Sequence, residues 1–359
     1  MQIIKLTHNN HQQVIDQAIA VLKNNGLIIY PTETVYGAGV DACNQVAVAK
    51  LLRYKTRREG KPLSIAVASQ EMAKKYVKVN EQAQKLYDKF LPGPYTIISK
   101  GKQTLAQGVA SEFNTVGVRI PQHQLILELV NQYGRAITAT SANASDKKRP
   151  YSVDDILNNL SLKQKNLIEL IIDAGTLPRN EPSTVIDTTL STPLTLRGEG
   201  VKKKANHSQP LIFVSHSEQE TRDIAGKILF KYWEQIKQRG LVIGLTGELG
   251  AGKTIFAKGI ADFLQIKDII TSPTYTYLKE YSYDRYQVRG CFHHLDLWRL
   301  DQTQDAQFLQ IEQLLAKKNV IAFEWWNHTK KLLPQVKPDI EVELKVLTTE
   351  KRQLKVYEK

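Results

Sequence analysis

One segment of the chain has the residue types and the spacing of a phosphate-binding loop. Gly247-Glu-Leu-Gly-Ala-Gly-Lys253-Thr254 fits the pattern G-x-x-x-x-G-K-[ST], in which backbone N–H groups surround the phosphates of a nucleotide. In this pattern Lys253 reaches the β- and γ-phosphates, and the hydroxyl of Thr254 ligates Mg²⁺. The residues expected to bind the nucleotide are therefore Gly247, Glu248, Leu249, Gly250, Ala251, Gly252, Lys253 and Thr254.

A phosphate-binding loop connects a buried strand to a helix, and the segments on either side of this one have those patterns. Residues 241–246 form an apolar run typical of a buried strand, and residues 254–264 have the apolar spacing of a helix. The N-terminus of that helix then points its positive dipole end at the phosphates. A glycine-rich turn without a nucleotide is the alternative, and the complete motif in this setting favours the nucleotide site.

Four polar clusters in the first half of the chain also carry groups that can do chemistry. They lie at residues 31–37, 55–63, 140–143, and 182–187 with 196–198. In an extended segment Thr32 and Thr34 point to the same side, so that two hydroxyls can face one cavity. Taken singly, each cluster has an ordinary explanation, such as β propensity, a solvated loop, a helix cap or a turn.

Together, and in this order, the four clusters resemble the YrdC/TsaC family of L-threonylcarbamoyladenylate synthases. The resemblance runs from about Gln2 to Gly200 and includes Leu-Pro-Gly-Pro-Tyr-Thr at 91–96 and Val-Gly-Val-Arg-Ile-Pro at 116–121. It implies an enzyme that joins L-threonine, bicarbonate and ATP into threonylcarbamoyl-AMP and releases pyrophosphate. Two loops depart from the family, because Arg58 replaces a usual proline and Ser145-Asp146 replaces a frequent Ser-Gly.

The resemblance also implies roles for individual residues of the first half. Cations can neutralise a triphosphate and a departing pyrophosphate, while Ser and Asn can hydrogen-bond to phosphate or ribose. The implied catalytic set, which also binds ATP, is Lys55, Arg57, Ser141 and Asn143. We expect Arg197 to add a contact to ATP and Arg119 to hold the carboxylate or carbamate of threonine. Hydroxyl contacts to threonine are expected from Thr32, Thr34, Thr115 and Ser183.

Three motifs in the second half resemble those of the TsaE family of small ATPases. They are Thr-Ser-Pro-Thr-Tyr-Thr at 271–276, His-His-Leu-Asp-Leu-Trp-Arg-Leu at 293–300, and Val-Ile-Ala-Phe-Glu-Trp at 320–325. The resemblance, from Leu211 to the end, implies an ATPase of the pathway that makes threonylcarbamoyladenosine in tRNA, acting with the proteins TsaB and TsaD. Any contact with tRNA is expected through that complex. Trp298 and Trp326 replace a Tyr and a Pro of the family, which can change partner contacts.

Two carboxylates of the second half are candidates for the Mg²⁺ ligand. Glu324 ends the most apolar strand, where its side chain emerges beside the phosphate-binding loop. We therefore assign Glu324, with Thr254, to Mg²⁺, and Asp296 to positioning of water or to coupling with the switch-like loop at 271–276, although the two carboxylates could be exchanged. Trp325 is expected to pack in a core.

The composition is that of a globular protein with two domains. The chain has 359 residues, of which 42% are hydrophobic and 24% are charged, and this length is enough for two separate cores. Residues 202–210 are polar and cationic, have no apolar periodicity and end in proline, as linkers do. We expect domains at residues 1–205 and 211–359 with a linker at 206–210.

Apolar periodicity on both sides of this linker predicts an α/β fold, with alternating strands and helices. The first domain is expected to have strands at 26–30, 64–68, 95–99 and 116–120 and helices at 12–24 and 80–90. The second is expected to have a helix at 218–238, strands at 291–297 and 320–323, and a hairpin of 339–346 with 353–357. With the two resemblances, this predicts a YrdC-like twisted mixed α/β domain followed by a P-loop NTPase α/β domain.

Charge and cysteine content indicate the surroundings of the protein. The net charge is +13, and residues 1–210 hold 27 Lys and Arg against 17 Asp and Glu, which suits nucleotides or RNA but is equally explained by a basic proteome. Cys43 and Cys291 lie in different halves, so they suggest neither a disulfide nor a metal site, and His293 and His294 point to opposite faces of a strand. No apolar run approaches the ~20 residues of a membrane span, and no signal peptide is visible, so we expect a cytoplasmic protein without a membrane partner.

Two other functions are compatible with the sequence. One is an RNA-binding or regulatory protein, with the phosphate-binding loop as a conformational switch. It would need spread cations and would tolerate loss of Ser141 or Asn143, whereas adenylate synthesis would not. The other is a small-molecule kinase, which is disfavoured because the second half contains no recognisable region for a phosphate acceptor.

Overall fold

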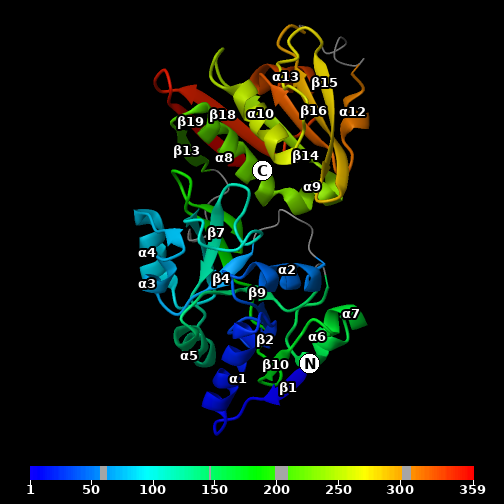
Figure 1. Cartoon of the computed structure of the whole chain (residues 1–359). Coiled ribbons are helices and arrows are strands. Elements are labelled where there is room, and N and C mark those ends of the chain that lie inside the picture. The colour runs from blue at the N-terminus through cyan, green and yellow to red at the C-terminus, as the bar shows by residue number, and fades with distance from the viewer. Residues whose placement is uncertain (57–62, 145–146, 199–208, 301–308) are drawn as a thin grey trace. The chain divides into compact units, whose positions relative to one another are not determined.

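The computed structural model describes residues 1–56, 63–144, 147–198, 209–300 and 309–359 (Figure 1). The chain divides into two compact units, which we treat separately. The first contains residues 1–189 and 193–201, and the second contains residues 190–192 and 202–359. Mixed sheets covered by helices are present in both units, which confirms the expected α/β class. Within the described ranges, no helix is long and apolar enough to cross a membrane.

The first unit contains a mixed five-stranded sheet that carries two of the predicted clusters. Its strands follow the order β1-β10-β2-β3-β9, in which β1, β10 and β2 are parallel and β3 runs antiparallel to both β2 and β9. Because Gly37 of β3 pairs with Ser141 of β9, the segment that follows residues 31–36 is brought beside the Ser-x-Asn segment. The strands are β1 (Gln2–Lys5), β2 (Ile28–Tyr30), β3 (Gly37–Gly39), β9 (Thr140–Ser141) and β10 (Leu170–Asp173).

A second sheet of this unit carries expected threonine contacts in β7 and the expected ATP contact Arg197 in β12. Its order is β12-β11-β6-β7-β4-β8, and β5 pairs with β6. Arg119 is the last residue of β7 and Arg197 is the last residue of β12. The strands are β4 (Ser64–Ala66), β5 (Val77–Lys78), β6 (Tyr95–Gly101), β7 (Thr115–Arg119), β8 (Ile137–Thr138), β11 (Thr184–Asp187) and β12 (Leu194–Arg197).

The helices of the first unit form where apolar spacing and capping residues predict them. The first, α1 (His11–Lys23), buries Val14, Ala18 and Leu22 on one face, and the side chain of Asn80 caps α4 (Glu81–Phe90) by accepting from the N–H of Ala83. Both helices agree with the expected ranges to within one residue at each end. The other helices are α2 (Gln45–Tyr54), α3 (Gln70–Ala73), α5 (Gln124–Tyr133), α6 (Val153–Leu157) and α7 (Leu162–Lys165).

The second unit is built on one seven-stranded sheet with the order β13-β19-β18-β14-β17-β16-β15. The strands β18, β14, β17 and β16 are mutually parallel, and hairpins with β19 and β15 flank them. The expected hairpin and the strands β14 and β17 are confirmed. The strands are β13 (Leu211–Ser215), β14 (Leu241–Thr246), β15 (Leu278–Arg285), β16 (Val288–Asp296), β17 (Val320–Glu324), β18 (Ile340–Val346) and β19 (Arg352–Glu358).

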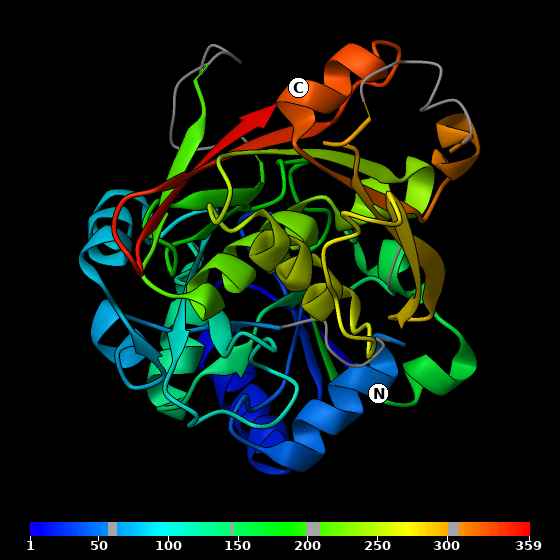
Figure 2. The ribbon, with the colours of Figure 1, turned by 90° about the horizontal axis from the view of Figure 1, so that it is seen from above.

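The central strands of this sheet are nearly continuous in apolar residues because helices cover both of their faces. On one face α8 and α10 lie side by side (Figures 1 and 2), and a Cβ added to Gly259 of α10 would lie 2.5 Å from the carbonyl oxygen of Arg222 in α8. On the other face Trp326 of α13 packs on Gly244 of β14, where an added Cβ would lie 2.5 Å from the indole Cγ. The helices are α8 (Glu218–Lys231), α9 (Trp233–Arg239), α10 (Lys253–Leu264), α12 (Ile311–Leu314) and α13 (Trp326–Leu332).

One helix differs from the expected length. The sequence predicts a single helix over 218–238, whereas the structure has α8 and α9 separated at Tyr232, whose backbone angles (φ −94°, ψ 8°) end the first helix and begin the second. Trp233 then turns into the core, against the ring of Phe263 at a centroid distance of 5.7 Å. Tertiary packing of this indole thus accompanies a break that periodicity alone did not reveal.

Candidate functional site

Lys55 lies at the C-terminal end of α2, where its ammonium group is buried against the Ser-x-Asn segment. The residue is 4% exposed, and Nζ donates to the carbonyl oxygens of Ser141, at 2.8 Å, and of Asn143. Helix α2 ends here because Thr56 adopts a left-handed conformation, with φ of 48°. A cation is therefore fixed directly beneath the turn that carries Ser141 and Asn143.

The side chains of Ser141 and Asn143 bond to one another and to the following loop. The hydroxyl of Ser141 donates to Oδ1 of Asn143 at 2.5 Å, and Nδ2 of Asn143 donates to the carbonyl of Lys147 at 2.7 Å. The hydrogen bonds of Lys55, which follows α2, thus bring three members of the expected catalytic set together at the end of β9. The fourth, Arg57, lies outside the described residues, as do Arg58 and Ser145-Asp146.

The two threonines of the segment between β2 and β3 face one another, as the sequence predicts. Their Oγ1 atoms are 3.1 Å apart, and both residues are buried, with Thr32 5% and Thr34 2% exposed. Arg119 joins this group from the end of β7, since its Nη2 lies 2.6 Å from Oε1 of Glu33 and 3.4 Å from Oγ1 of Thr34. Glu33, which the sequence analysis passes over, is therefore the direct partner of Arg119.

Arg197 and Ser183 form a second cationic group, from β12 and the segment before β11. The guanidinium of Arg197 donates from Nη2 to the hydroxyl of Ser183 at 2.9 Å and from Nε to its carbonyl at 3.1 Å. Burial lowers the pKa of Arg197, and the positive charges of Arg119 and Arg149 lower it further. Three guanidinium groups therefore create a positive field here, which suits anionic substrates.

Thr115 lies apart from the other expected threonine contacts. It begins β7 and Arg119 ends it, a separation of about 13 Å at ~3.3 Å per residue. Its hydroxyl is 2.7 Å from that of Ser111 in the neighbouring turn. The chain order of the motifs could not reveal this, because Thr115 and Arg119 lie close together in sequence and yet at opposite ends of one strand.

In the second unit the phosphate-binding loop has the backbone that its glycines permit. Gly247, Gly250 and Gly252 have φ angles of 145°, 76° and 102°, which side chains with a Cβ rarely adopt. Lys253 folds back over the loop, and its Nζ donates to the carbonyls of Gly247 and Glu248, each at 2.9 Å. Burial lowers the pKa of Lys253, and the carboxylates of Glu324 and Asp296 act in the opposite direction.

Glu324 and Thr254 share one hydrogen bond beside this loop. The hydroxyl of Thr254 donates to Oε1 of Glu324 at 2.9 Å, and Nε2 of His294 lies 2.8 Å from the same oxygen. Glu324 is 3% exposed, at the end of β17. A hydroxyl and a carboxylate at this spacing are oxygen ligands of the kind that Mg²⁺ prefers, so the residues fit that ion.

Asp296 ends the neighbouring strand β16, in register with Glu324, but it contacts a different segment. Its Oδ2 accepts hydrogen bonds from the hydroxyls of Ser272 at 3.0 Å and Thr274 at 3.1 Å, and its Oδ1 accepts from the N–H of Trp298 at 3.2 Å. Asp296 thus ties the loop that follows α10 to the end of β16. The two carboxylates are adjacent, and their partners differ.

Trp325 does not pack in the core as the sequence analysis expects; its neighbour Trp326 does. Trp326 is 2% exposed and its Nε1–H donates to Glu341 at 2.9 Å. Trp325 is only partly buried, has a left-handed backbone with φ of 57°, and places its ring centroid 3.6 Å from Nζ of Lys253. Because the backbone turns at Trp325, the two consecutive indoles point in different directions, that of Trp325 toward Lys253 and that of Trp326 into the core.

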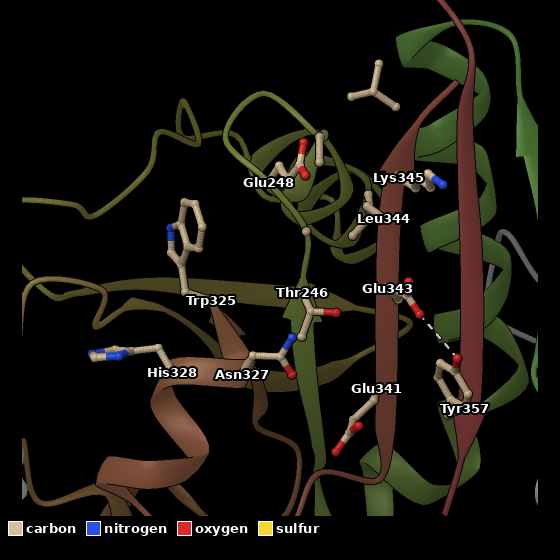
Figure 3. Close-up of a pocket in the computed structure, with 13 residues that line it drawn as sticks. Thr246, Glu248, Trp325, Asn327, His328, Glu341, Glu343, Leu344, Lys345 and Tyr357 are labelled. Atoms are coloured by element: carbon tan, nitrogen blue, oxygen red, sulfur yellow. Dashed lines mark hydrogen bonds between the residues drawn. The ribbon is translucent and has the colours of Figure 1, made fainter. Parts of the chain in front are cut away.

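A pocket of about 770 Å³ opens beside the phosphate-binding loop, a size within the range of small-molecule sites (Figure 3). Trp325 and His328 lie on one side of it, and Lys345, Glu343 and Tyr357 lie on the other, where the hydroxyl of Tyr357 donates to Glu343 at 3.2 Å. The remaining lining residues are Thr246, Gly247, Glu248, Ala251, Asn327, Glu341, Leu344 and Val346. Sequence reasoning missed this pocket, because its walls come from β14, β18, β19 and α13.

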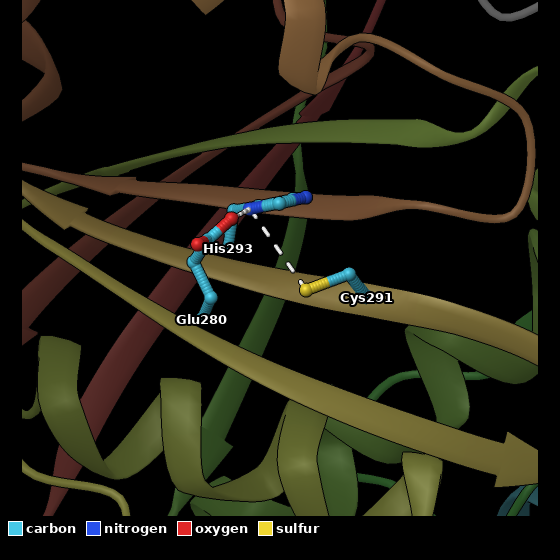
Figure 4. Close-up of side chains that lie close together, drawn as sticks. All are labelled: Glu280, Cys291 and His293. Atoms are coloured by element: carbon cyan, nitrogen blue, oxygen red, sulfur yellow. Dashed lines mark hydrogen bonds and ion pairs between the residues drawn. The ribbon is translucent and has the colours of Figure 1, made fainter.

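Three side chains that could ligate a metal lie close together on the β15–β16 hairpin, a grouping that the positions of the two cysteines in the sequence do not reveal (Figure 4). Nδ1 of His293 lies 3.0 Å from Oε1 of Glu280 and 3.9 Å from Sγ of Cys291. Glu280 pairs with His293 across the hairpin, and Cys291 precedes His293 by two positions on the same face. The antiparallel pairing of β15 with β16 therefore brings the three side chains together.

The hydrogen bonds around His293 nevertheless disfavour a metal ion. Asn319 accepts from the N–H of Cys291 and donates to the carbonyl of Leu314, which fixes the orientation of its amide. The same Nδ2 lies 3.1 Å from Nε2 of His293, so Nε2 is the acceptor and Nδ1 carries the proton that faces Glu280. A metal bound through Nδ1 would require the opposite tautomer, and burial raises the pKa of the Cys291 thiol. We therefore assign this cluster as a hydrogen-bonded group.

Comparison with known families places each unit. Residues 20–198 match the Sua5/YciO/YrdC family model, which is described as "Telomere recombination", and residues 215–354 match TsaE, described as a threonylcarbamoyl adenosine biosynthesis protein. A protein of Methanocaldococcus jannaschii is 37% identical over 186 residues, which cover 52% of this chain and 86% of that protein. The threonylcarbamoyl-AMP synthase of Pyrococcus abyssi is 34% identical over 200 residues, which cover 55% of this chain but only 58% of that protein.

A solved structure supports the same assignment at the level of the fold. The crystal structure of Pyrococcus abyssi Sua5 complexed with L-threonine aligns with 90% of this chain and 92% of that chain, at 23% identity and a TM-score of 0.51. The two family matches and the relative that is 37% identical confirm the resemblances that the sequence indicates for the two halves. The chain belongs to the Sua5/YrdC family, and it joins a domain of that family to a TsaE domain.

Proposed function

We propose that the first unit synthesises threonylcarbamoyl-AMP from L-threonine, bicarbonate and ATP and releases pyrophosphate. The observation that carries this proposal is the group formed by Lys55, Ser141 and Asn143, in which a buried ammonium bonds to the backbone of the Ser-x-Asn turn. Family membership of residues 20–198 supports it, and the named relative from Pyrococcus abyssi is a threonylcarbamoyl-AMP synthase.

In the proposed reaction the residues act by position and charge. Arg119, beside Thr32 and Thr34, holds the carboxylate of threonine. The amine nitrogen of threonine bonds to the carbon of bicarbonate as a C–O bond of bicarbonate breaks, and water leaves to give the carbamate. An oxygen of the carbamate then forms a bond to the α-phosphorus of ATP as the bond to the bridging oxygen breaks, and pyrophosphate leaves with that electron pair. Lys55, with Arg57, offsets the charge that builds up on the departing pyrophosphate. Arg197 completes the contacts to the nucleotide.

We propose that the second unit hydrolyses ATP in support of a TsaB–TsaD transferase. Lys253 would bind the β- and γ-phosphates, and Thr254 and Glu324 would hold Mg²⁺, which screens phosphate charge when it is bound. Asp296, through Ser272 and Thr274, would couple hydrolysis to the loop that follows α10. We place both reactions in the cytoplasm, a setting that suits the two free thiols, Cys43 and Cys291.

The decisive experiment for the first unit supplies the full chain with L-threonine, bicarbonate and Mg-ATP. We expect pyrophosphate and threonylcarbamoyl-AMP in equal amounts, detected by a coupled phosphate assay and by mass spectrometry. Omission of bicarbonate or threonine should abolish both products. Release of pyrophosphate without the adenylate, or no product under any of these conditions, would contradict the proposed synthase.

For the second unit we expect that the chain alone leaves tRNA unmodified and that addition of TsaB and TsaD restores modification. Glu324→Ala should reduce multiple turnover at least ~10-fold while a first turnover persists, because the carboxylate beside Thr254 would be lost from the ATP site. The matched control is Glu350→Ala, at an exposed position. Burst and steady-state formation of threonylcarbamoyladenosine are measured separately. Efficient modification by the purified chain alone would overturn the proposed dependence on partners.

A further inference from the structure

The ion pair between Glu33 and Arg119 is held rigidly from both sides. The backbone carbonyl of Glu33 accepts a hydrogen bond from Nδ2 of Asn180 at 2.8 Å, and the neighbouring N–H of Thr34 donates to Oγ1 of Thr32 at 3.2 Å. Arg119 leaves the end of β7, where its backbone is part of the sheet. The side chains of the pair are 14% and 13% exposed, respectively, so both charges are largely removed from water.

Each member of this pair has one buried polar atom without a hydrogen-bond partner among the described residues. Glu33 uses Oε1 and Arg119 uses Nη2 for their contact of 2.6 Å, whereas Oε2 of Glu33 and Nε of Arg119 are buried and unbonded among the residues that the structure describes. A buried acceptor or donor left unpaired is costly, and more so when it carries charge. The pair thus offers one free acceptor and one free donor to a ligand.

The surroundings of the pair are positively charged, so the free carboxylate oxygen of Glu33 stands out more than the free N–H of Arg119. Burial lowers the pKa of Arg197, and the positive charges of Arg119 and Arg149 lower it further, so this region favours anions. A cationic amine would be repelled unless a carboxylate faced it, and Glu33 supplies that carboxylate. Burial lowers the pKa of His123 and raises that of Tyr30, and the negative charge of Glu33 acts to raise both.

We propose that Glu33 recognises the α-amino group of the amino acid whose carboxylate Arg119 binds, and so makes the site selective for α-amino acids. This inference rests on the proposed synthase function of the first unit. In an α-amino acid the nitrogen and the carboxylate are attached to one carbon, so they can reach the two ends of a single ion pair. Oε2 of Glu33 accepts an N–H of the ligand, and Nε–H of Arg119 donates to its carboxylate. The carbamate nitrogen keeps one N–H for the same acceptor.

The proposal is tested by equilibrium binding to the full chain without ATP, measured by isothermal titration calorimetry. L-Threonine is compared with 3-hydroxybutyrate, which has the same carboxylate and hydroxyl but no amine. Glu33→Gln keeps the size of the side chain and a carbonyl for Nη2 of Arg119, and it removes the charge. We expect it to weaken threonine binding at least tenfold and to change 3-hydroxybutyrate binding less than about twofold, since a site built for an N–H discriminates against its absence.

Two further variants test whether the loss of threonine binding comes from the carboxylate of Glu33. Glu33→Asp retains the charge and should retain a preference for threonine, whereas Glu81→Gln, the same change at an exposed position of α4, should match the wild type. Persisting 3-hydroxybutyrate binding in Glu33→Gln shows that the fold is intact.

Three outcomes would overturn the inference. Equal losses for the two ligands would mean that Glu33 only holds Arg119 in place. Threonine binding that is unchanged or tighter in Glu33→Gln would mean that the carboxylate is neutral or competes with the substrate. A wild-type chain that binds threonine neither with nor without ATP would instead refute the proposed synthase, and this inference with it.

Discussion

Lys55→Ala is expected to lower the rate of threonylcarbamoyl-AMP formation at least ~100-fold, the loss typical when a charged group is removed from a preorganised phosphate site. The side chain is 4% exposed and bonds to the carbonyls of Ser141 and Asn143, so its charge is fixed where no solvent can replace it. Formation of pyrophosphate at saturating threonine, bicarbonate and Mg-ATP measures the effect.

Loss of a buried ammonium could also disturb the turn, so the assay needs structural controls. Lys55→Met keeps most of the aliphatic stem without the charge and should lose activity to a similar extent. Lys85→Ala removes an exposed lysine of α4 and should leave the rate unchanged. Equal melting temperatures of the three variants would show that the fold persists. Activity of Lys55→Met within about twofold of the wild type would refute the assignment of Lys55.

Lys253→Ala is expected to abolish ATP hydrolysis by the second unit, again by at least ~100-fold, and to leave adenylate synthesis intact. The ammonium lies within 2.9 Å of two loop carbonyls, the position from which it can turn to the β- and γ-phosphates. Release of phosphate in the presence of TsaB and TsaD reports hydrolysis, and release of pyrophosphate with threonine and bicarbonate reports synthesis. The two assays on one preparation separate the two nucleotide sites.

The matched control is Lys267→Ala, which removes an exposed lysine that follows α10. It should change neither reaction. A parallel loss of both reactions in Lys253→Ala, with an unchanged melting temperature, would mean that the two units depend on one nucleotide site. Full hydrolysis by Lys253→Ala would mean that ATP is bound elsewhere.

Short-range patterns were sufficient for much of this protein. The phosphate-binding loop lies within eight consecutive residues, and its glycines dictate the backbone that the structure shows at Gly247, Gly250 and Gly252. The strands β14 and β17 and the helices α1 and α4 follow from apolar periodicity, because the period of an element is a local property. The identity of both families likewise followed from motifs that are contiguous in the chain.

The partners of the reactive side chains were decided only by tertiary structure. Arg119 and Glu33 are 86 positions apart in sequence, and Lys55 and the Ser141 carbonyl are equally distant, so no local rule selects either pair. Tertiary packing brings them together, since Lys55 follows α2 and meets the end of β9, and Arg119 at the end of β7 meets the segment between β2 and β3.

The surroundings of several other side chains depend on the exact position of a residue in its strand or turn. Trp325 and Trp326 are identical in type, and the turn after β17 sends one to Lys253 and the other into the core. Thr115 and Arg119 are close in sequence and lie at opposite ends of β7, whereas Glu280 and His293 are distant in sequence and face one another across a hairpin. Sequence thus determined which chemical groups the protein has and which elements carry them. Their meeting depends on long-range packing, because side-chain direction reverses with each residue of a strand and contacts between strands are set by the whole sheet.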